Sequence, residues 1–301
     1  MKVFVTGATG GVGSYAVKEL LAQGFDVACL VRDPAKISAT KAKAIVGDLT
    51  DVLAIEKSFA EFRPDTIIHL GWIGIDQKDK GSNNQILNLQ AAVELLQLAT
   101  KYGVKNFIGM GSESEYGVHG KKIDETAKTS PLTKYAIAKL AAGLLCEKIC
   151  GDNGIHFTWL RLFSSYGPGD RQGSLMSLLI KTLLNKEPMK LSQCVQVWDY
   201  VHAADIGRLL TLIASQPKEQ GIYNLGGGQA QVLKNIVLKI AAEINPDADL
   251  RFGEIPYGAN QNMHLEADIS KLARVYGWTP KVSLEQGLHE TIEWHKSLLG
   301  L

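Results

Sequence analysis

The sequence predicts an α/β fold, in which a doubly wound parallel sheet is followed by a second, smaller C-terminal lobe. Apolar runs such as KVFVT (2–6) and DVACLV (26–31) alternate with helical patterns through the first half of the 301-residue chain. Runs that are apolar throughout are typical of strands buried on both faces of a parallel sheet. A glycine-rich turn and then a helix follow the first run, as in a βαβ unit.

The other elements complete this pattern. Strands are expected at 44–48, 66–70, 106–110 and 156–162, with helices at 13–23, 51–61, 84–103 and 131–153. After Pro168 we expect a helix at 174–186, strands at 197–201 (VWDYV) and 221–225, and helices at 203–215, 232–244 and 284–298. The sheet domain is therefore expected to comprise residues 1–165 with about 195–225, and the smaller lobe residues 166–194 and 226–301.

Composition excludes several classes of protein. The formal net charge is +1 and there is no basic block, so a nucleic-acid partner is not expected. No apolar run approaches the roughly 20 residues of a membrane span, and MKVFVTG at the N-terminus is not a secretion signal, so a cytoplasmic protein is expected. The four cysteines have no histidine or acid partner at ligand spacing, which favours buried thiols over a metal site.

The turn TGATGGVG (6–13) predicts a dinucleotide site in the sheet domain. Small residues allow a tight turn and a close approach to a pyrophosphate, and the helix that follows offers unpaired N–H groups. The residues expected to hold the cofactor here are Gly7, Gly10, Gly11, Val12 and Gly13.

The end of the second strand favours NADP over NAD. Enzymes that prefer NAD place an acid there for the ribose 2′-hydroxyl, whereas this chain has Val31 and then Arg32, which would pair with a 2′-phosphate. NAD remains the alternative, because Asp33 follows. Asp48 could accept from the adenine amino group, and Leu49 and Leu70 are expected beside the cofactor.

Tyr135 and Lys139 lie four residues apart on an expected helix and so share one face. Lowering the pKa of a phenol from about 10 by about 3 units requires about 4 kcal/mol. A lysine cation about 4 Å away supplies that at an effective dielectric near 20. An ordinary amphipathic helix would show the same spacing, but the preceding dinucleotide turn and five strands favour a proton-transferring tyrosine.

Together these motifs resemble the extended short-chain dehydrogenase/reductases, in the nucleotide-sugar epimerase/dehydratase group with its Rossmann-like fold. The resemblance runs nearly from end to end, through TGATGGVG, GDL (47–49), IIHL (67–70), GSESEYG (111–117), YAIAK (135–139), LRLFSSYGPG (160–169), WDYVHAADI (198–206), YNLGGG (223–228), ADISKL (267–272), YGWTP (276–280) and SLEQGL (283–288).

The resemblance implies roles for several residues. Ser112 would bind the reacting hydroxyl or ketone, Tyr135 would donate or accept its proton, and Lys139 would keep the pKa of Tyr135 low and bind the cofactor ribose. Asn88 matches an asparagine near the cofactor, although a surface position on the helix is an equal alternative. Relatives often form dimers through the helices at 84–103 and 131–153, so a homodimer is one interpretation of their apolar faces, and a core contact is the other.

Other positions depart from the family pattern in the expected substrate pocket. Trp198 stands where the family often has a phosphate-binding arginine, Ser164 replaces an asparagine, and Trp72 replaces a small residue. Arg171 could contact a phosphate, while Arg161 is expected to be structural.

Glu113 stands where the dehydratases of this family have the first acid of an Asp-Glu pair. A carboxylate there could act as an acid for water loss. Because Ser114 replaces the second acid, a polar pocket contact is preferred for Glu113. The expected substrate contacts are thus Trp72, Ser112, Glu113, Ser164 and Arg171.

These observations favour an NADP-dependent reduction of a keto group, at C4 of a nucleotide-linked deoxysugar. An NAD-retaining nucleotide-sugar 4-epimerase is the alternative, because it needs the same three catalytic residues. A non-catalytic dinucleotide-binding protein is a third, which the presence of all three residues disfavours.

Overall fold

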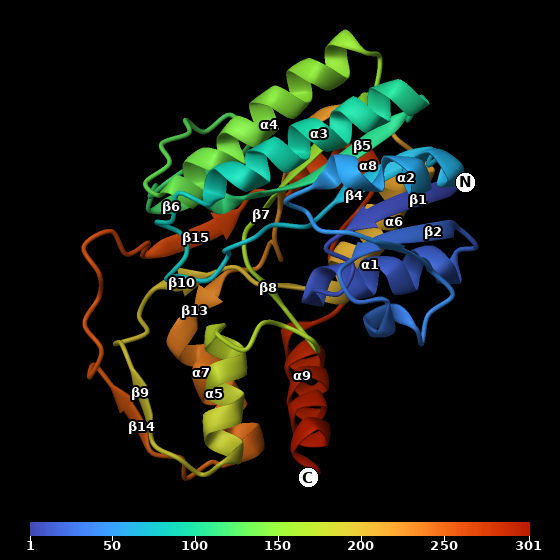
Figure 1. Cartoon of the computed structure of the whole chain (residues 1–301). Coiled ribbons are helices and arrows are strands. Elements are labelled where there is room, and N and C mark those ends of the chain that lie inside the picture. Colours follow the sequence, from blue (N-terminus) through green and yellow to red (C-terminus); the bar gives the residue numbers. More distant parts are fainter.

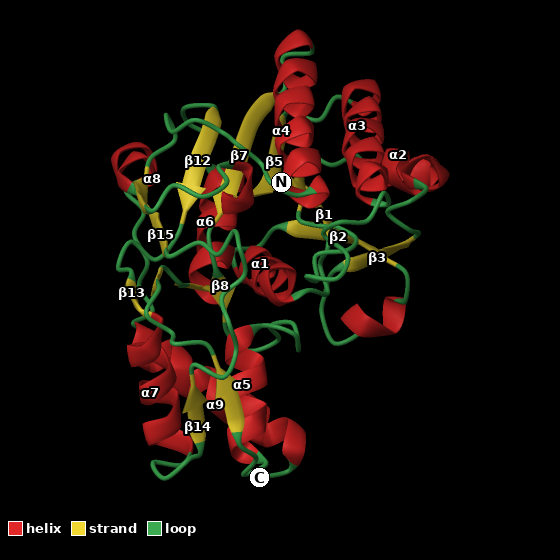
Figure 2. Ribbon diagram, turned by 90° about the vertical axis from the view of Figure 1, so that its left-hand side faces the viewer, coloured by secondary structure: helices red, strands yellow, loops and turns green.

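A seven-stranded parallel sheet forms the centre of the computed structural model, which describes all 301 residues. Its order is β12–β7–β5–β4–β1–β2–β3 (Figures 1 and 2). The strands are β1 (Lys2–Thr6), β2 (Asp26–Val31), β3 (Lys43–Val46), β4 (Thr66–His69), β5 (Asn106–Ser112), β7 (His156–Leu162) and β12 (Gly221–Leu225). The strand order reverses between β1 and β4, and the carboxyl ends of parallel strands open a crevice at such a point.

Helices cover both faces of this sheet and create two cores. Successive side chains of a strand point to opposite faces, so Val3 and Val5 of β1 lie in one core and Phe4 lies in the other. The first core packs against α1 (Gly11–Ala22) and α6 (Ala203–Ser215), and the second against α2 (Glu56–Phe62), α3 (Gln85–Tyr102) and α4 (Lys134–Asp152). Strands with both faces covered explain the continuous apolar runs in the sequence.

The start of α4 is fixed by a side-chain cap. Thr133 has an extended backbone, and its hydroxyl accepts a hydrogen bond of 3.1 Å from the N–H of Ala136. Such a cap satisfies one of the unpaired donors at a helix N-terminus. Tyr135 consequently lies in the first turn of α4.

The smaller lobe lies beyond the carboxyl ends of the strands (Figure 1). Its core is formed by α5 (Leu175–Leu184), α7 (Leu233–Ile244) and α9 (Leu284–Leu299). A four-stranded sheet joins it to the large domain, in the order β13 (Gln231–Val232), β10 (Val197–Trp198), β15 (His264–Ala267) and β6 (Lys121–Ile123). Two strand pairs complete it, β8 (Ser165–Tyr166) with β11 (Val201–His202) and β9 (Met189–Leu191) with β14 (Leu250–Phe252).

Three segments pack differently from the expected division of the chain. Residues 121–123 and 197–198 were assigned to the sheet domain, but they form β6 and β10, which both pair with β15. Residues 270–276 were assigned to the lobe, but they form α8 (Ser270–Tyr276), which packs on β12 in the core of the large sheet. All three segments are short, and short elements give little periodicity. Residues 203–225 contain α6 and β12, which pack in the core of the large domain.

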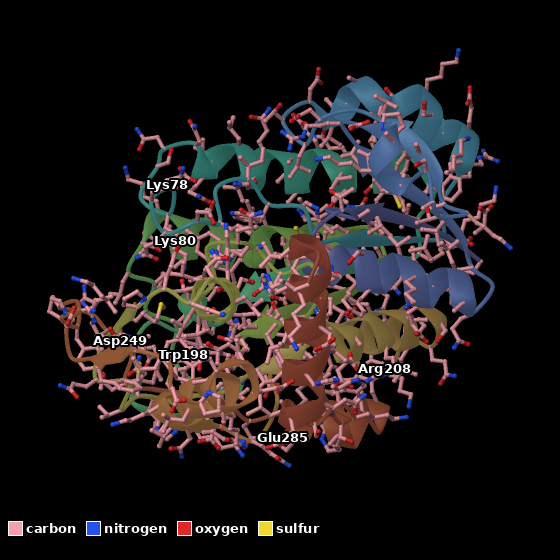
Figure 3. All side chains as sticks on the ribbon, turned by 90° about the horizontal axis from the view of Figure 1, so that it is seen from below. Lys78, Lys80, Trp198, Arg208, Asp249 and Glu285 are labelled. Atoms are coloured by element: carbon pink, nitrogen blue, oxygen red, sulfur yellow. The ribbon has the colours of Figure 1, made fainter.

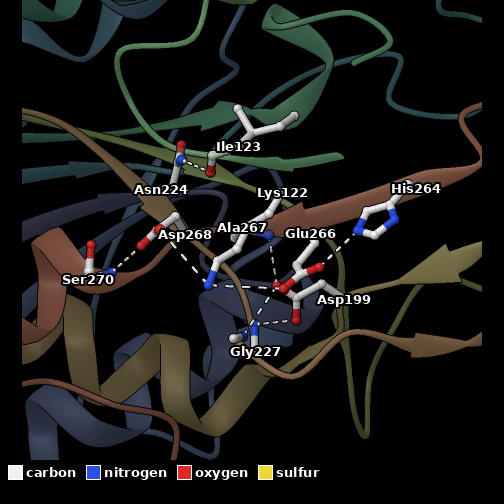
Figure 4. A network of polar contacts seen from close by, with 11 residues as sticks. Lys122, Ile123, Asp199, Asn224, Gly227, His264, Glu266, Ala267, Asp268 and Ser270 are labelled. Atoms are coloured by element: carbon white, nitrogen blue, oxygen red, sulfur yellow. Dashed lines mark hydrogen bonds and ion pairs between the residues drawn. The ribbon is translucent and has the colours of Figure 1, made fainter. Parts of the chain in front are cut away.

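The expected strand at 197–201 is broken in two. Its middle residue, Asp199, is fully buried and accepts hydrogen bonds from the N–H groups of Gly227 (2.8 Å) and Ala267 (3.1 Å). Figure 4 shows this carboxylate between the glycine turn after β12 and the end of β15. These bonds turn the chain between β10 and β11, so the two halves of VWDYV belong to different sheets.

Candidate active site

A cleft with a volume of about 640 Å³ opens between the large sheet and the lobe. The glycine turn after β1 lines one end of it, and the lobe residues Gln196, Trp198 and Leu233 line the other. Lys80, on the segment before α3, and Trp198, on β10, line this cleft from distant parts of the chain; both are labelled in Figure 3. The cleft therefore has the place that a doubly wound sheet gives to its ligands.

The glycine turn fits a pyrophosphate. Gly7 has a left-handed backbone, with φ of +72°, and a Cβ added there would lie 2.6 Å from the backbone nitrogen of Gly71. A Cβ at Gly13 would collide with the carbonyl oxygen of Gly7. α1 begins without a side-chain cap and has no acidic residue in its first turn, so its unpaired N–H groups face the cleft at Gly11 and Val12.

Ser112, Tyr135 and Lys139 come together on the same cleft. Ser112 ends β5, where its hydroxyl donates to the Glu113 carboxylate and accepts from the N–H of Ser114 at 3.2 Å. Tyr135 and Lys139 lie one turn apart on α4, and the Lys139 ammonium is 6.0 Å from the centre of the Tyr135 ring. The expectation that these three residues share one site agrees with this geometry.

The electrostatics of Tyr135 differ from the expectation. Burial raises the pKa of the phenol above its usual 10.0, and the negative charge of Glu113 raises it further, while a hydrogen bond with Ser112 opposes both effects. The Lys139 ammonium does not point at the phenol; it donates to the carbonyl oxygen of Met110 at 2.6 Å. Burial and Glu113 therefore raise the pKa of Tyr135, which Lys139 was expected to lower.

Lys139 itself is a buried cation. Only 4% of its surface is exposed, and burial lowers its pKa from 10.5 to about 7. Its ammonium lies 3.7 Å from the centre of the Trp72 ring. Trp72, expected to contact substrate, thus lines the cleft beside Tyr135 and Lys139.

Glu113 is a polar member of the cleft wall. Its carboxylate accepts hydrogen bonds from the hydroxyls of Ser112 and Ser114, and burial raises its pKa while the charge of Lys80 opposes the increase. Ser114, which stands in place of the second acid of the dehydratase pair, therefore donates a hydrogen bond to Glu113.

Ser164 and Arg171 also line the cleft, but both have protein partners. The Ser164 hydroxyl accepts a hydrogen bond of 2.8 Å from the indole N–H of Trp198, and Arg171 donates to the carbonyl oxygen of Ile75 at 2.9 Å. Arg171 also lies 3.7 Å from the Asp76 carboxylate. These contacts connect the walls of the cleft.

Four of the expected cofactor contacts lie outside the cleft lining. Arg32 is largely exposed and lies 3.9 Å from Asp48, whose carboxylate also accepts two hydrogen bonds from Thr50. Leu49 packs against the core under α2 and α3. Leu70, in contrast, lines the cleft as expected.

Asn88 is the fourth of these residues. Its surroundings fit neither a cofactor contact nor a surface position on the helix, which were the two expectations. Its side chain is fully buried, and both ends of the amide bind the backbone of Ile73, at 2.6 and 2.9 Å. The residue is neither on the surface nor open to the cleft. It fixes the segment that carries Trp72.

Two structural residues of the site were not singled out in the sequence. Glu115 is fully buried and accepts hydrogen bonds from the N–H of Ser112 (2.9 Å) and from Arg161 (2.7 Å). This ion pair confirms the structural role expected of Arg161 and fixes the backbone of Ser112. Asp199, described above, is the other. For Asp199 the available signal was an acid in the otherwise apolar VWDYV, whereas Glu115 lies in the polar GSESEYG and gave no such signal.

The parallel sheet, the glycine turn and the clustered serine, tyrosine and lysine define a dinucleotide-dependent enzyme of the short-chain dehydrogenase type. The sequence profile described as "NAD dependent epimerase/dehydratase family" matches residues 3–226, and the chain belongs to this family. No helix of the structure is sufficiently long and apolar to span a membrane.

Several relatives of this chain are named as nucleotide-sugar enzymes. A Bacillus subtilis protein described as an uncharacterized UDP-glucose epimerase, YtcB, is 28% identical over 99% of both chains. MoeE5, whose structure is solved in complex with UDP-glucose and NAD, is 28% identical in sequence. The match covers 99% of this chain and 100% of the MoeE5 chain, with a TM-score of 0.85. The UDP-glucose 4-epimerase of Thermotoga maritima, at 24% identity over 99% of this chain and all of that one, shows the same fold with a TM-score of 0.90.

Proposed function

We propose that the chain is an NAD-dependent 4-epimerase of a nucleotide-linked hexose. The observation that carries the proposal is the meeting of Ser112, Tyr135 and Lys139 with the glycine turn on one cleft. The family and the two relatives named for UDP-glucose epimerisation support it. They favour this function over the ketone reduction that the sequence alone placed first.

Gly7 to Gly13 would hold the pyrophosphate, and Lys139 the ribose beside the nicotinamide. When bound, the dinucleotide would supply a hydride acceptor and donor. Inversion requires that the hydride removed from the sugar carbon be returned to the opposite face of the ketone formed there. Tyr135 would take the proton of the sugar hydroxyl through its phenol oxygen and give it back to the ketone oxygen, as a general base and then a general acid. Ser112 would orient that oxygen, once its own hydroxyl turns from Glu113 toward the substrate.

The surroundings of Glu113 favour epimerisation over dehydration. Loss of water from a sugar needs a group that removes a carbon-bound proton and one that protonates the leaving hydroxyl. Here the single carboxylate already accepts from two serine hydroxyls. A polar contact with the sugar is the role that remains for it.

A second candidate, an NADP-dependent ketoreductase, is favoured by one observation. Arg32 follows β2, and its guanidinium lies beside the end of β3 without a close ion pair, since Asp48 is 3.9 Å away. An arginine in this place can donate two parallel hydrogen bonds to the oxygens of a 2′-phosphate.

The assay that separates the two functions starts with the purified protein and no added cofactor. We expect conversion of UDP-glucose to UDP-galactose, and release of NAD from the denatured protein, identified by mass spectrometry. Release of NADP, together with NADPH consumption on a 4-keto sugar nucleotide and no epimer, would establish the reductase instead. A protein that is inactive in both assays and binds either dinucleotide would contradict both functions.

Arg32→Ala tests the cofactor directly. If the guanidinium binds a 2′-phosphate, the variant should bind NADPH about tenfold more weakly, which corresponds to the loss of about 1.5 kcal/mol. NADH binding should not change, because its ribose carries no phosphate there. Both affinities are measured by fluorescence titration of wild type and variant. Unchanged NADPH binding would remove the only observation in favour of NADP.

A further inference from the structure

Trp72 contacts both members of the catalytic pair. It follows β4 and lines the cleft, and the face of its indole lies 3.7 Å from the Lys139 ammonium. The Tyr135 ring meets it edge to face, at 6.1 Å between ring centres and 80° between planes. The tryptophan is therefore in contact with the cation and next to the phenol.

Lys139 has no carboxylate partner that would compensate its burial. Its one hydrogen bond goes to a neutral carbonyl oxygen, that of Met110, and no acid lies within 4 Å of its ammonium. Glu115, the carboxylate with the largest effect on it, is bound to Arg161. A buried charge without a partner is costly, and the electron-rich face of an indole is the strongest aromatic partner for a cation.

The indole is held in this position from α3. Its N–H donates to the side-chain oxygen of Gln85 at 2.8 Å, and the buried Gln85 amide donates to the carbonyl oxygens of Gly74 (2.7 Å) and Asp79 (3.2 Å). Together with the bonds between Asn88 and Ile73, these contacts fix the segment between β4 and α3. The ring cannot turn away from Lys139 without breaking them.

We propose that Trp72 is a positioning residue, whose indole face keeps the Lys139 ammonium charged and beside Tyr135. The proposal rests on the proposed function, in which Tyr135 moves a proton. Charged Lys139 favours the ionised phenol, so the ring acts on the reaction through the lysine.

Several other groups act on the same lysine. Glu115 on the segment after β5 and Cys146 on α4 raise its pKa, and burial lowers it. His69 on β4 is kept neutral by burial and by Lys139, with its pKa lowered to about 3. These groups are unchanged in a variant of Trp72. A change in the Lys139 pKa when Trp72 is replaced therefore measures the effect of the indole ring.

The test compares Trp72→Phe with Trp72→Leu. The two side chains are similar in size and both lose the indole N–H, but only phenylalanine keeps an aromatic face. The pKa of the Lys139 ammonium is measured by NMR of protein with ¹⁵N-labelled lysine side chains, with Lys139→Met to assign the signal. Trp294→Leu, on the distant α9, is the matched control.

We expect the Lys139 pKa in Trp72→Leu to fall about one unit below that in Trp72→Phe. At pH 7.5 the charged fraction then falls, so kcat with UDP-glucose should be about tenfold lower in the leucine variant, while KM changes little. Trp294→Leu should match wild type in both measurements. Equal pKa and kcat values for the phenylalanine and leucine variants would overturn the proposal.

Fluorinated tryptophan provides a second test that keeps the shape of the side chain, in case Trp72→Leu does not fold. Fluorine withdraws electron density from the ring face, so the Lys139 pKa should fall as the number of fluorines increases. A constant pKa across the series would overturn the proposal. If wild type does not epimerise UDP-glucose, the proposed function fails, but both NMR titrations still measure the effect of Trp72 on Lys139.

Discussion

Tyr135→Phe should abolish turnover while cofactor binding stays close to that of wild type. The ring and its contacts with Trp72 and Lys80 remain, and only the hydroxyl that carries the proton is lost. A positioned general acid or base contributes roughly 10²- to 10⁴-fold to the rate, so kcat should fall by about that factor. Turnover is measured as UDP-galactose formation, and dinucleotide binding by the nucleotide content of the purified variant.

Tyr102→Phe is the matched control for this variant. Tyr102 also loses only a hydroxyl, but that hydroxyl donates to Glu56 on the surface, away from the cleft. It should therefore turn over at the wild-type rate. Near-wild-type turnover in Tyr135→Phe would contradict the mechanism, and loss of the dinucleotide in parallel with turnover would assign Tyr135 to binding.

Elements with a clear apolar pattern, either a continuous run or a helical stripe, could be predicted from the sequence. β1, β2, β7, α6 and β12 have the expected bounds. Each of these strands is buried on both faces and ends at a polar or glycine-rich turn, and α6 has a regular apolar stripe against α1. In these segments the local pattern and the tertiary packing favour the same structure.

The short strands of the lobe could not be predicted. β6 and β15 have three and four residues, and both mix charged and apolar side chains. Their pairing depends on Asp199, Asn224 and the turn at Gly227, which come from other segments and meet only in the folded chain (Figure 4). A period needs more residues than these strands have.

The meeting of Ser112, Tyr135 and Lys139 on one cleft could be predicted, but the arrangement of their charges could not. Spacing and order were sufficient to place Tyr135 and Lys139 on one face of a helix near a dinucleotide turn. Whether the lysine ammonium points at the phenol depends on Met110 and Trp72, which lie on other strands and loops. Whether the pKa of Tyr135 rises or falls depends on that tertiary environment and on burial.

Glu115→Ala should be the most destabilising single change at this site. The side chains of Glu115 and Arg161 are 1% and 4% exposed, and the carboxylate also accepts hydrogen bonds from the N–H of Ser112 and the indole of Trp159. Removing it leaves a buried cation and two buried donors without a partner. Breaking a buried ion pair in this way costs about 3–5 kcal/mol in the free energy of unfolding, which urea denaturation would measure.

Two further variants separate the charge from the packing. Glu115→Gln keeps the shape and one oxygen acceptor, so it should lose less stability than Glu115→Ala. In the double variant Glu115→Gln with Arg161→Met the unpaired cation is gone, and much of the lost stability should return, because an apolar replacement of a buried pair is often neutral. A loss below about 1 kcal/mol in Glu115→Ala would mean that water reaches Arg161 and that the pair contributes little.

The folded fraction of Glu115→Ala should also turn over more slowly than wild type, since the backbone of Ser112 loses the carboxylate that holds it at the end of β5. The pair thus connects the stability of the sheet to the position of the Ser112 hydroxyl.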